Sequence, residues 1–329
     1  MEYKELILVC GFSRSGTTWL AKILDALPNV LFVSEPDKRI YSDLKFGKVS
    51  HCSNLEDNKN EYILYKKALQ EVVDMVHCNL MTFPFFKKQY CNVPYTLYWI
   101  FAAIYKFFSS RLCLNLRLPP FLFKKNEKVN VVWKSVNQSS NLSCLKNAFH
   151  SIKIVYIVRN PYATITSMFQ HKKMAMDGED LRRIAERQNS IFFQKNPINK
   201  SDILSMSDIQ KRSLLWRIEC ESAYWESHTN PSIHMVLYED LVRNPWDVVK
   251  NICSFLSCPF SPEIQKFLKQ STGEIKPPLI SRILSTGYFG VYRKQNVDVT
   301  KWKKKLSREY YNQINEIVKD SPLIHNWED

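Results

Sequence analysis

The feature that most constrains the fold of this chain lies at residues 7–20, where an apolar run leads directly into a turn with two glycines. The run ILVC is typical of a buried β-strand, and the apolar spacing that begins at Trp19 is typical of a helix. In a strand, turn and helix of this order, the N–H groups of the turn and the free N–H groups of the helix start point to one place. The segment therefore predicts a phosphate-binding loop at the end of a β-strand.

The spacing of Gly11 and Gly16 is that of a phosphate-binding loop, but Thr17 follows where a nucleoside triphosphatase carries lysine. That lysine reaches the β- and γ-phosphates, so its absence argues against ATP or GTP as the ligand. Arg14 supplies a cation from inside the loop. A nucleotide kinase or NTPase with a modified loop is the alternative enzyme class, and a turn that needs glycine only for its backbone is the structural alternative.

The length and charge of the chain limit its class. Its 329 residues and 45% hydrophobic content favour a globular α/β protein, which we assign to a single domain over 1–329. The net charge of +14 favours an anionic ligand, nucleic acid or an anionic membrane surface. No recognised nucleic-acid-binding motif accompanies that charge, so we expect no nucleic acid partner. A basic protein that binds nucleic acid or membranes without catalysis is the third class considered.

The cysteines and the first residues indicate the compartment. The nine cysteines are odd in number and contain no CxxC pair, a pattern typical of free thiols in a reducing compartment and not of a zinc site. Strand-like sequence begins by about Leu6, which leaves no room before it for a signal peptide or a membrane anchor. We therefore expect a cytoplasmic protein.

Charged residues follow the other predicted strands. Strand patterns occupy 29–33, 129–133, 153–158 and 234–237. The charged residues that follow them are Glu35, Lys134, Arg159 and Glu239. The carboxyl ends of parallel strands share one edge of a sheet, at which ligands bind, so we expect these residues to gather near Arg14. The pattern predicts an α/β fold, a three-layer sandwich with a central parallel β-sheet flanked by helices.

The second predicted strand ends in a carboxylate. Pro36 stops the strand ladder and is expected to hold Glu35 in an extended conformation at the strand end. A carboxylate at this edge of the sheet can take a proton from a hydroxyl group, so Glu35 is the candidate general base. A solvated loop carboxylate is the alternative interpretation.

Residues 40–128 are hard to place on a sheet and are rich in aromatic side chains. Within them, 95–108 is apolar on most faces, and about fourteen residues are too few to span a bilayer. We interpret 40–128 as a largely helical insertion that covers the active site and shapes the acceptor pocket. Contact of residues 95–125 with a membrane surface is the alternative.

Two motifs together resemble those of the sulfotransferases that use 3′-phosphoadenosine-5′-phosphosulfate (PAPS). The run Ser13-Arg14-Ser15-Gly16-Thr17-Thr18-Trp19 is similar to the 5′-phosphosulfate loop of that family. Arg159-Asn160-Pro161, followed by Ser167, is similar to its 3′-phosphate motif, and the tetrapeptide at 238–241 matches a further recurring segment. The resemblance covers 6–38 and about 130–320. It implies a P-loop-type sandwich, PAPS as donor and 3′-phosphoadenosine-5′-phosphate (PAP) as product.

The resemblance assigns a set of residues to the donor. They are Ser13, Arg14, Ser15, Gly16, Thr17, Thr18, Trp19, Arg159, Ser167, Tyr238, Arg293 and Lys294. Within this set, the amides of 14–18 and the hydroxyls of Thr17 and Thr18 take the 5′-phosphate. Arg159 and Ser167 take the 3′-phosphate through an arginine–anion pair and a hydroxyl contact.

Two further positions of that set carry less regular motifs. Tyr238 is assigned to the adenine side of the donor pocket. Arg293 and Lys294 stand where the family often has Arg-Lys-Gly, but Gln295 replaces the glycine in this chain. The sequence therefore does not decide whether this C-terminal segment contacts the 3′-phosphate.

Sulfuryl transfer needs a base for the acceptor hydroxyl and positive charge where the leaving phosphate gains negative charge. Arg14 fits the second role, and Lys134 resembles a catalytic lysine of the cytosolic branch of the family. That branch has a catalytic histidine two residues after the lysine, where this chain has Val136. Glu35-Pro36 instead resembles the glutamate-proline of carbohydrate sulfotransferases, so Glu35 is the predicted base. We expect no metal.

The same departure bears on the acceptor. A glutamate-proline pair in place of a histidine favours enzymes that act on sugar hydroxyls over those that act on phenols and steroids. The aromatic insertion leaves room for a glycolipid or another lipid-linked alcohol. The expected acceptor is therefore a hydroxyl group on a carbohydrate, a glycolipid or another lipid-linked molecule.

Overall fold

The computed structural model describes residues 2–36, 81–112, 116–139, 142–170, 179–188, 190–285, 290–293 and 297–327. Much of the predicted insertion, namely 40–80 and 113–115, therefore lies outside the described residues. Lys294 and Gln295, with the contact predicted for them, lie outside the described residues as well.

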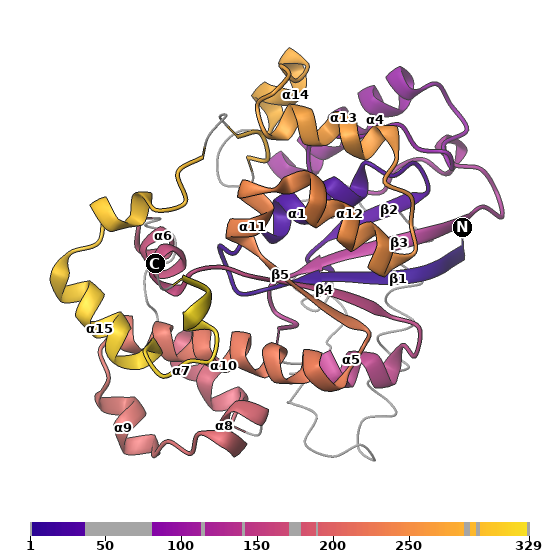
Figure 1. Cartoon of the computed structure of the whole chain (residues 1–329). Helices are drawn as coiled ribbons and strands as arrows, with labels where there is room; N and C mark the ends of the chain where they lie inside the picture. Colours follow the sequence, from indigo (N-terminus) through magenta and orange to yellow (C-terminus); the bar gives the residue numbers. More distant parts are fainter. Residues whose placement is uncertain are drawn as a thin grey trace.

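A parallel sheet of five strands forms the centre of the molecule (Figure 1). The strands are β1 (Glu2–Cys10), β2 (Val30–Ser34), β3 (Lys128–Ser135), β4 (Lys153–Val158) and β5 (Ile233–Leu237). Their order is β2-β3-β1-β4-β5, and every neighbouring pair is parallel. Strand β1 is thus central, and the loop that follows it lies where the strand order divides the sheet into two halves.

Helices cover both faces of the sheet, and the strand sequences show why. Along β1, Leu6, Leu8 and Cys10 belong to one buried cluster, while Ile7 and Val9 belong to another. Side chains alternate between the two faces of a strand, so a strand that is apolar at every position needs a cover on each side. The three-layer α/β sandwich predicted from the sequence is confirmed.

The two layers of helices come from different parts of the chain, as Figure 1 shows. On one face lie α1 (Thr17–Asp25), α12 (Pro245–Leu256) and α13 (Pro262–Ser271). The other face packs against α6 (Pro161–Phe169), α10 (Asp208–Thr229) and α15 (Arg308–Val318). The remaining elements are α4 (Tyr95–Leu112), η2 (Pro120–Leu122), α5 (Leu142–Ala148), α7 (Glu179–Glu186), α8 (Ile191–Lys195), α9 (Lys200–Ser205), α11 (Tyr238–Arg243), α14 (Leu279–Leu284), η5 (Lys301–Lys304) and η6 (Ile324–Trp327).

A buried cluster of charges fixes the segment after residue 80 to helix α1. Asp25 forms an ion pair with Lys22 and a second one with Lys88, whose Nζ lies 2.7 Å from the Asp25 Oδ1. Lys88 also donates to the carbonyl of Leu27 at 3.1 Å, and Lys22 donates to the carbonyl of Thr82 at 2.9 Å. All three charged side chains are buried, and burial lowers the pKa of Lys22 to about 8. One carboxylate therefore holds two ammonium groups in the interior.

This cluster predicts unequal effects for two substitutions. Asp25→Asn leaves two buried ammonium groups without a counter-ion, so it should lower the free energy of unfolding by about 3–5 kcal/mol. Lys22→Met removes the ammonium that burial already disfavours and keeps the pair of Asp25 and Lys88, so it should cost clearly less. Urea unfolding of both variants at neutral pH measures the difference. Equal losses would show that Asp25 does not hold the cluster together.

Candidate functional site

The loop between β1 and α1 is shaped by two glycines that leave no space for a side chain. A Cβ atom at Gly11 would lie 2.2 Å from the carbonyl oxygen of Ile157, on β4. A Cβ atom at Gly16 would lie 2.6 Å from the ring of Tyr238, and the φ of Gly16 is 96°. Arg14 also has a positive φ, 70°, which is uncommon for a residue other than glycine. Close contact with β4 and α11 therefore fixes the conformation of the loop.

The N-terminus of α1 is open toward a ligand. The helix begins at Thr17 after the N-cap residue Gly16, no side chain caps it, and its first turn contains no acidic residue. The N–H groups there carry the positive end of the helix dipole. The hydroxyl of Ser15 is buried and has no hydrogen-bond partner among the described residues. This arrangement of donors suits an anion such as phosphate.

Three of the predicted phosphate-binding residues meet beside this loop. The guanidinium of Arg159 donates to the carbonyl oxygen of Arg14 at 2.9 Å. The Nε of Arg14 donates to the hydroxyl of Ser167 at 3.2 Å. The Nε of Arg159 is buried without a hydrogen-bond partner in the described part of the chain. The structure thus brings together residues from the first loop, the end of β4 and helix α6.

A third arginine reaches the same place from the C-terminal part of the chain. The Arg293 guanidinium lies 3.7 Å from the centre of the Trp19 ring and donates to the Tyr238 hydroxyl at 2.8 Å. The Arg159 guanidinium lies 4.4 Å from the centre of the same Tyr238 ring. Burial lowers the pKa of Arg293, and the nearby charge of Arg159 acts in the same direction. Two arginines on one tyrosine ring make this region strongly positive.

The structure gives Trp19 a supporting position. Its side chain is only 2% exposed, and its indole N–H donates to the hydroxyl of Ser271 at 3.0 Å. The backbone N–H of Arg293 donates to the carbonyl of the same Ser271 at 3.0 Å. Trp19 therefore supports the Arg293 side chain, and Ser271 holds the Arg293 backbone.

The predicted base lies in an ion pair at the end of β2. The carboxylate of Glu35 pairs with the ammonium of Lys134, and the Glu35 N–H donates to the Lys134 carbonyl at 2.7 Å. Glu35 has a φ of 50°, so the prediction that Pro36 keeps it extended is wrong. The left-handed turn occurs at the residue that pairs with β3, and positions of this kind cluster at functional sites. Both side chains are largely shielded from solvent.

Glu239 differs in role from the other charged residues at the strand ends. Its carboxylate is buried and accepts hydrogen bonds from the Asn160 backbone N–H at 3.2 Å and from the Trp327 indole N–H at 2.9 Å. The Trp216 ring lies edge-on to Trp327 at 6.2 Å, and its own N–H donates to the Arg159 carbonyl at 3.2 Å. These tryptophans were not predicted, because no local pattern indicates which distant residue each one contacts.

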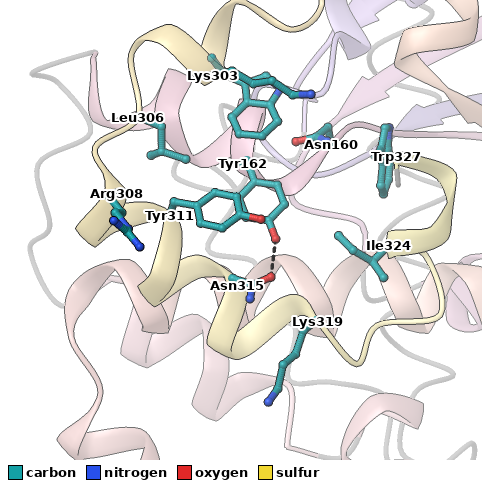
Figure 2. Close-up of a pocket in the computed structure, with 11 residues that line it drawn as sticks. Asn160, Tyr162, Lys303, Leu306, Arg308, Tyr311, Asn315, Lys319, Ile324 and Trp327 are labelled. Atoms are coloured by element: carbon teal, nitrogen blue, oxygen red, sulfur yellow. Dashed lines mark hydrogen bonds between the residues drawn. The ribbon is translucent and has the colours of Figure 1, made fainter. Parts of the chain in front are cut away.

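A cavity of about 630 Å³ adjoins this cluster, between α6 and the C-terminal helices. Figure 2 shows Tyr162 of α6 with its hydroxyl directed at Asn315 of α15, to which it donates at 2.8 Å. The Tyr162 ring stacks between Trp302 at 5.0 Å and Tyr311 at 4.9 Å. The C-terminal segment thus clamps the helix that carries Ser167.

The Glu239 carboxylate predicts a specific pH dependence. Burial raises its pKa above the ordinary value, so the folded protein holds this proton at a pH where the unfolded chain has lost it. Its contribution to stability is therefore present at low pH and is lost as the pH rises through the raised pKa. Glu239→Gln cannot lose a proton, so its unfolding free energy relative to the parent protein should increase as the pH is raised from about 4 to about 7. A constant difference over that range would contradict the buried carboxyl.

A second variant tests the hydrogen bond itself. Trp327→Phe removes the indole donor and should lower the unfolding free energy by about 1.5–3 kcal/mol at neutral pH, where the acceptor is charged. In the Glu239→Gln background the same substitution should cost less. Chemical denaturation of the two single variants and the double variant gives this coupling energy.

A family model described as "Sulfotransferase domain" matches residues 4–327. Among solved structures, the sulfotransferase domain of the curacin biosynthetic pathway has 15% identity and a TM-score of 0.45, and the match covers 97% of this chain and 98% of that one. Mouse sulfotransferase SULT7A1, complexed with PAP, has 14% identity and a TM-score of 0.46, with coverage of 98% and 86%. The comparison with curated protein sequences finds no match.

Proposed function

The chain belongs to the sulfotransferase domain family, and we propose that it transfers a sulfonate group from PAPS to an acceptor hydroxyl and releases PAP. The single observation that carries the proposal is the pair of arginines, Arg159 and Arg293, held on the Tyr238 ring next to a glycine loop without the kinase lysine. A donor with phosphates at both its 5′ and 3′ positions needs two anion sites side by side.

The residues of the loop fit the 5′ end of this donor. Gly11 and Gly16 allow a close approach of the backbone, and the start of α1 offers free N–H groups. The buried hydroxyl of Ser15 has no partner in the described ranges, which is costly unless a ligand supplies one. We assign the 5′-phosphate to this loop, with the hydroxyls of Thr17 and Thr18 and the side chain of Ser13 around it.

The residues beyond the loop fit the 3′ end. Arg159, whose Nε has no partner in the described part of the chain, and the hydroxyl of Ser167 both contact Arg14. Arg293 is the third group, fixed by the Trp19 ring and the Tyr238 hydroxyl. We assign the 3′-phosphate to Arg159 and Ser167, with Arg293 behind them, and the adenine side to Tyr238.

The bound donor supplies a sulfonate group on a phosphate leaving group, and the residues around it supply charge and a base. Arg14 always carries its positive charge and stabilises the negative charge that develops on the leaving phosphate. Lys134 assists from the end of β3, where its ammonium pairs with Glu35. Their combined charge makes the departure of PAP easier.

Glu35 is assigned as the general base that takes the proton of the acceptor hydroxyl. In the present arrangement its carboxylate pairs with Lys134, which weakens it as a base. A donor phosphate attracts the same ammonium, so Lys134 can turn from Glu35 to the donor and release the carboxylate. The ion pair thereby couples the strength of the base to the presence of the donor.

The acceptor is assigned to the hydroxyl of a carbohydrate or a glycolipid. Support comes from the sequence: Val136 replaces the catalytic histidine of the cytosolic branch, and Glu35-Pro36 resembles the carbohydrate branch. The aromatic residues of the insertion suit the apolar faces of sugars and lipid chains. We also assign to the insertion the role of covering this acceptor site.

The donor assignment predicts a difference between PAP and ATP. PAP places a 3′-phosphate against Arg159 and Arg293, whereas ATP lacks that phosphate and meets no lysine after Gly16. PAP should therefore raise the melting temperature, with a stabilisation of about 2.7 kcal/mol at a hundred times its dissociation constant, and ATP at the same concentration should have little effect. Arg159→Ala should remove most of the shift with PAP. Equal shifts with PAP and ATP would exclude the assignment.

The base assignment predicts a loss of turnover without a loss of donor binding. Glu35→Gln removes the proton acceptor, so kcat should fall by about 10²–10⁴-fold, while the thermal shift with PAP is retained. Turnover is measured as the transfer of label from PAPS to a panel of glycans, glycolipids and phenols, and the sugar-containing acceptors are expected to be labelled. Full activity of Glu35→Gln would remove Glu35 as the base, and label on phenols alone would overturn the acceptor class.

A further inference from the structure

Exposed apolar side chains are concentrated on three segments of the molecule. Among the described residues, 16 large hydrophobic side chains are exposed, and 13 of them lie in 95–112, in 121 or in 275–284. They are Tyr95, Leu97, Ile100, Ile104, Phe107, Phe108, Leu112, Phe121, Ile275, Leu279, Ile280, Ile283 and Leu284. Scattered exposed residues are normal on a protein surface, but a concentration of this kind marks an interaction site.

These segments form one surface, which we call the α4–α14 surface. The ring of Phe101 on α4 packs edge-on against Phe121 at 5.7 Å, which joins α4 to η2. Tyr292 forms a hydrogen bond with Ser281 of α14 and lies near Tyr95 of α4. In Figure 1 the helices α4 and α14 lie at the same end of the molecule. The two exposed helices therefore lie at one end of the molecule with Tyr292 between them.

The charges on this surface are of one sign. The stretches 95–112, 116–125 and 275–285 contain seven basic residues and no aspartate or glutamate. The basic residues are Lys106, Arg111, Arg117, Lys124, Lys125, Lys276 and Arg282. Apolar side chains flanked by cations suit the surface of an anionic bilayer, where the apolar groups enter the acyl boundary and the cations meet the headgroups.

We propose that the α4–α14 surface docks on an anionic lipid bilayer. The helices rest on the membrane and do not cross it: within the described ranges, none has the length and hydropathy that a crossing requires. The +14 net charge of the chain adds a general attraction to such a surface. A second copy of this chain carries the same excess of cations on this surface, so charge disfavours a symmetric dimer through it.

The docked orientation has a consequence for the acceptor, which rests on the proposed function. Tyr292, which links α4 and α14, directly precedes Arg293 of the donor site. The bilayer therefore lies next to the donor site, at the Arg293 side. An acceptor alcohol with a lipid tail can then keep its tail in the membrane while its hydroxyl group enters the site.

Co-sedimentation with vesicles tests the docking without any donor or acceptor. The probes are phosphatidylcholine vesicles with and without phosphatidylserine. The parent protein should bind the vesicles that contain phosphatidylserine, and binding should weaken as salt is added. The double variant Leu279→Glu/Ile283→Glu should bind these vesicles at least about tenfold more weakly, because it places two negative charges against the anionic headgroups.

A matched control separates this effect from a general loss of apolar surface. Leu204 on α9 is 55% exposed, similar to Leu279 at 60% and Ile283 at 58%, but it lies outside the α4–α14 surface. Leu204→Glu should bind vesicles like the parent protein. Unchanged melting temperatures of all variants, with and without PAP, show that the fold and the donor site are intact.

Three results would overturn the proposal. The first is no binding of the parent protein to phosphatidylserine vesicles, and the second is binding that Leu204→Glu reduces as much as the double variant does. The third is a self-association that the double variant abolishes while vesicle binding is absent, which would make the surface a dimer interface. None of these depends on catalysis, so a failure of the docking is distinguishable from a failure of the proposed sulfotransferase activity.

Discussion

The ring of Tyr238 is the contact on which the rest of the site depends. The Arg159 guanidinium lies over the face of the ring, and Arg293 donates a hydrogen bond to the hydroxyl. The edge of the ring lies so close to Gly16 that no side chain fits at that position. The tyrosine thus holds the glycine loop and the two arginines at fixed mutual distances. Since two like charges repel each other, they remain neighbours only where packing and a shared aromatic ring hold them.

Much of this arrangement could be predicted from the sequence, because parallel strands end at one edge of their sheet. The apolar runs before Arg14, Lys134 and Arg159 are β1, β3 and β4, and the structure brings Arg14, Arg159 and Ser167 together. Local patterns suffice here: a strand, a glycine turn and a helix start determine where their own residues lie. The family match agrees with the motifs on which the resemblance was based.

Contacts between distant side chains could not be predicted in this way. Glu239 follows a strand as expected, but its partner Trp327 is 88 residues away, and no local sequence pattern indicates that the two residues are in contact. The ion pairs of Asp25 with Lys88 and the stacking of Arg293 on Trp19 are of the same kind. Glu35 shows that a local rule can also fail. The residue before a proline is usually extended. Glu35, which pairs with Lys134, instead has a left-handed backbone conformation.

The bond between Trp327 and Glu239 also bears on the order of events during synthesis. The glycine loop after β1 emerges from the ribosome early, and domains form as their parts emerge. Asn160, the N-cap residue of α6, donates its N–H to Glu239, and the same carboxylate is joined to a tryptophan that emerges some 300 residues after that loop. The nascent chain can therefore build its central sheet early, but the helix that carries Ser167 is clamped only near the end of translation. Donor binding through Ser167, as we propose it, therefore requires that the C-terminal part of the chain has been made.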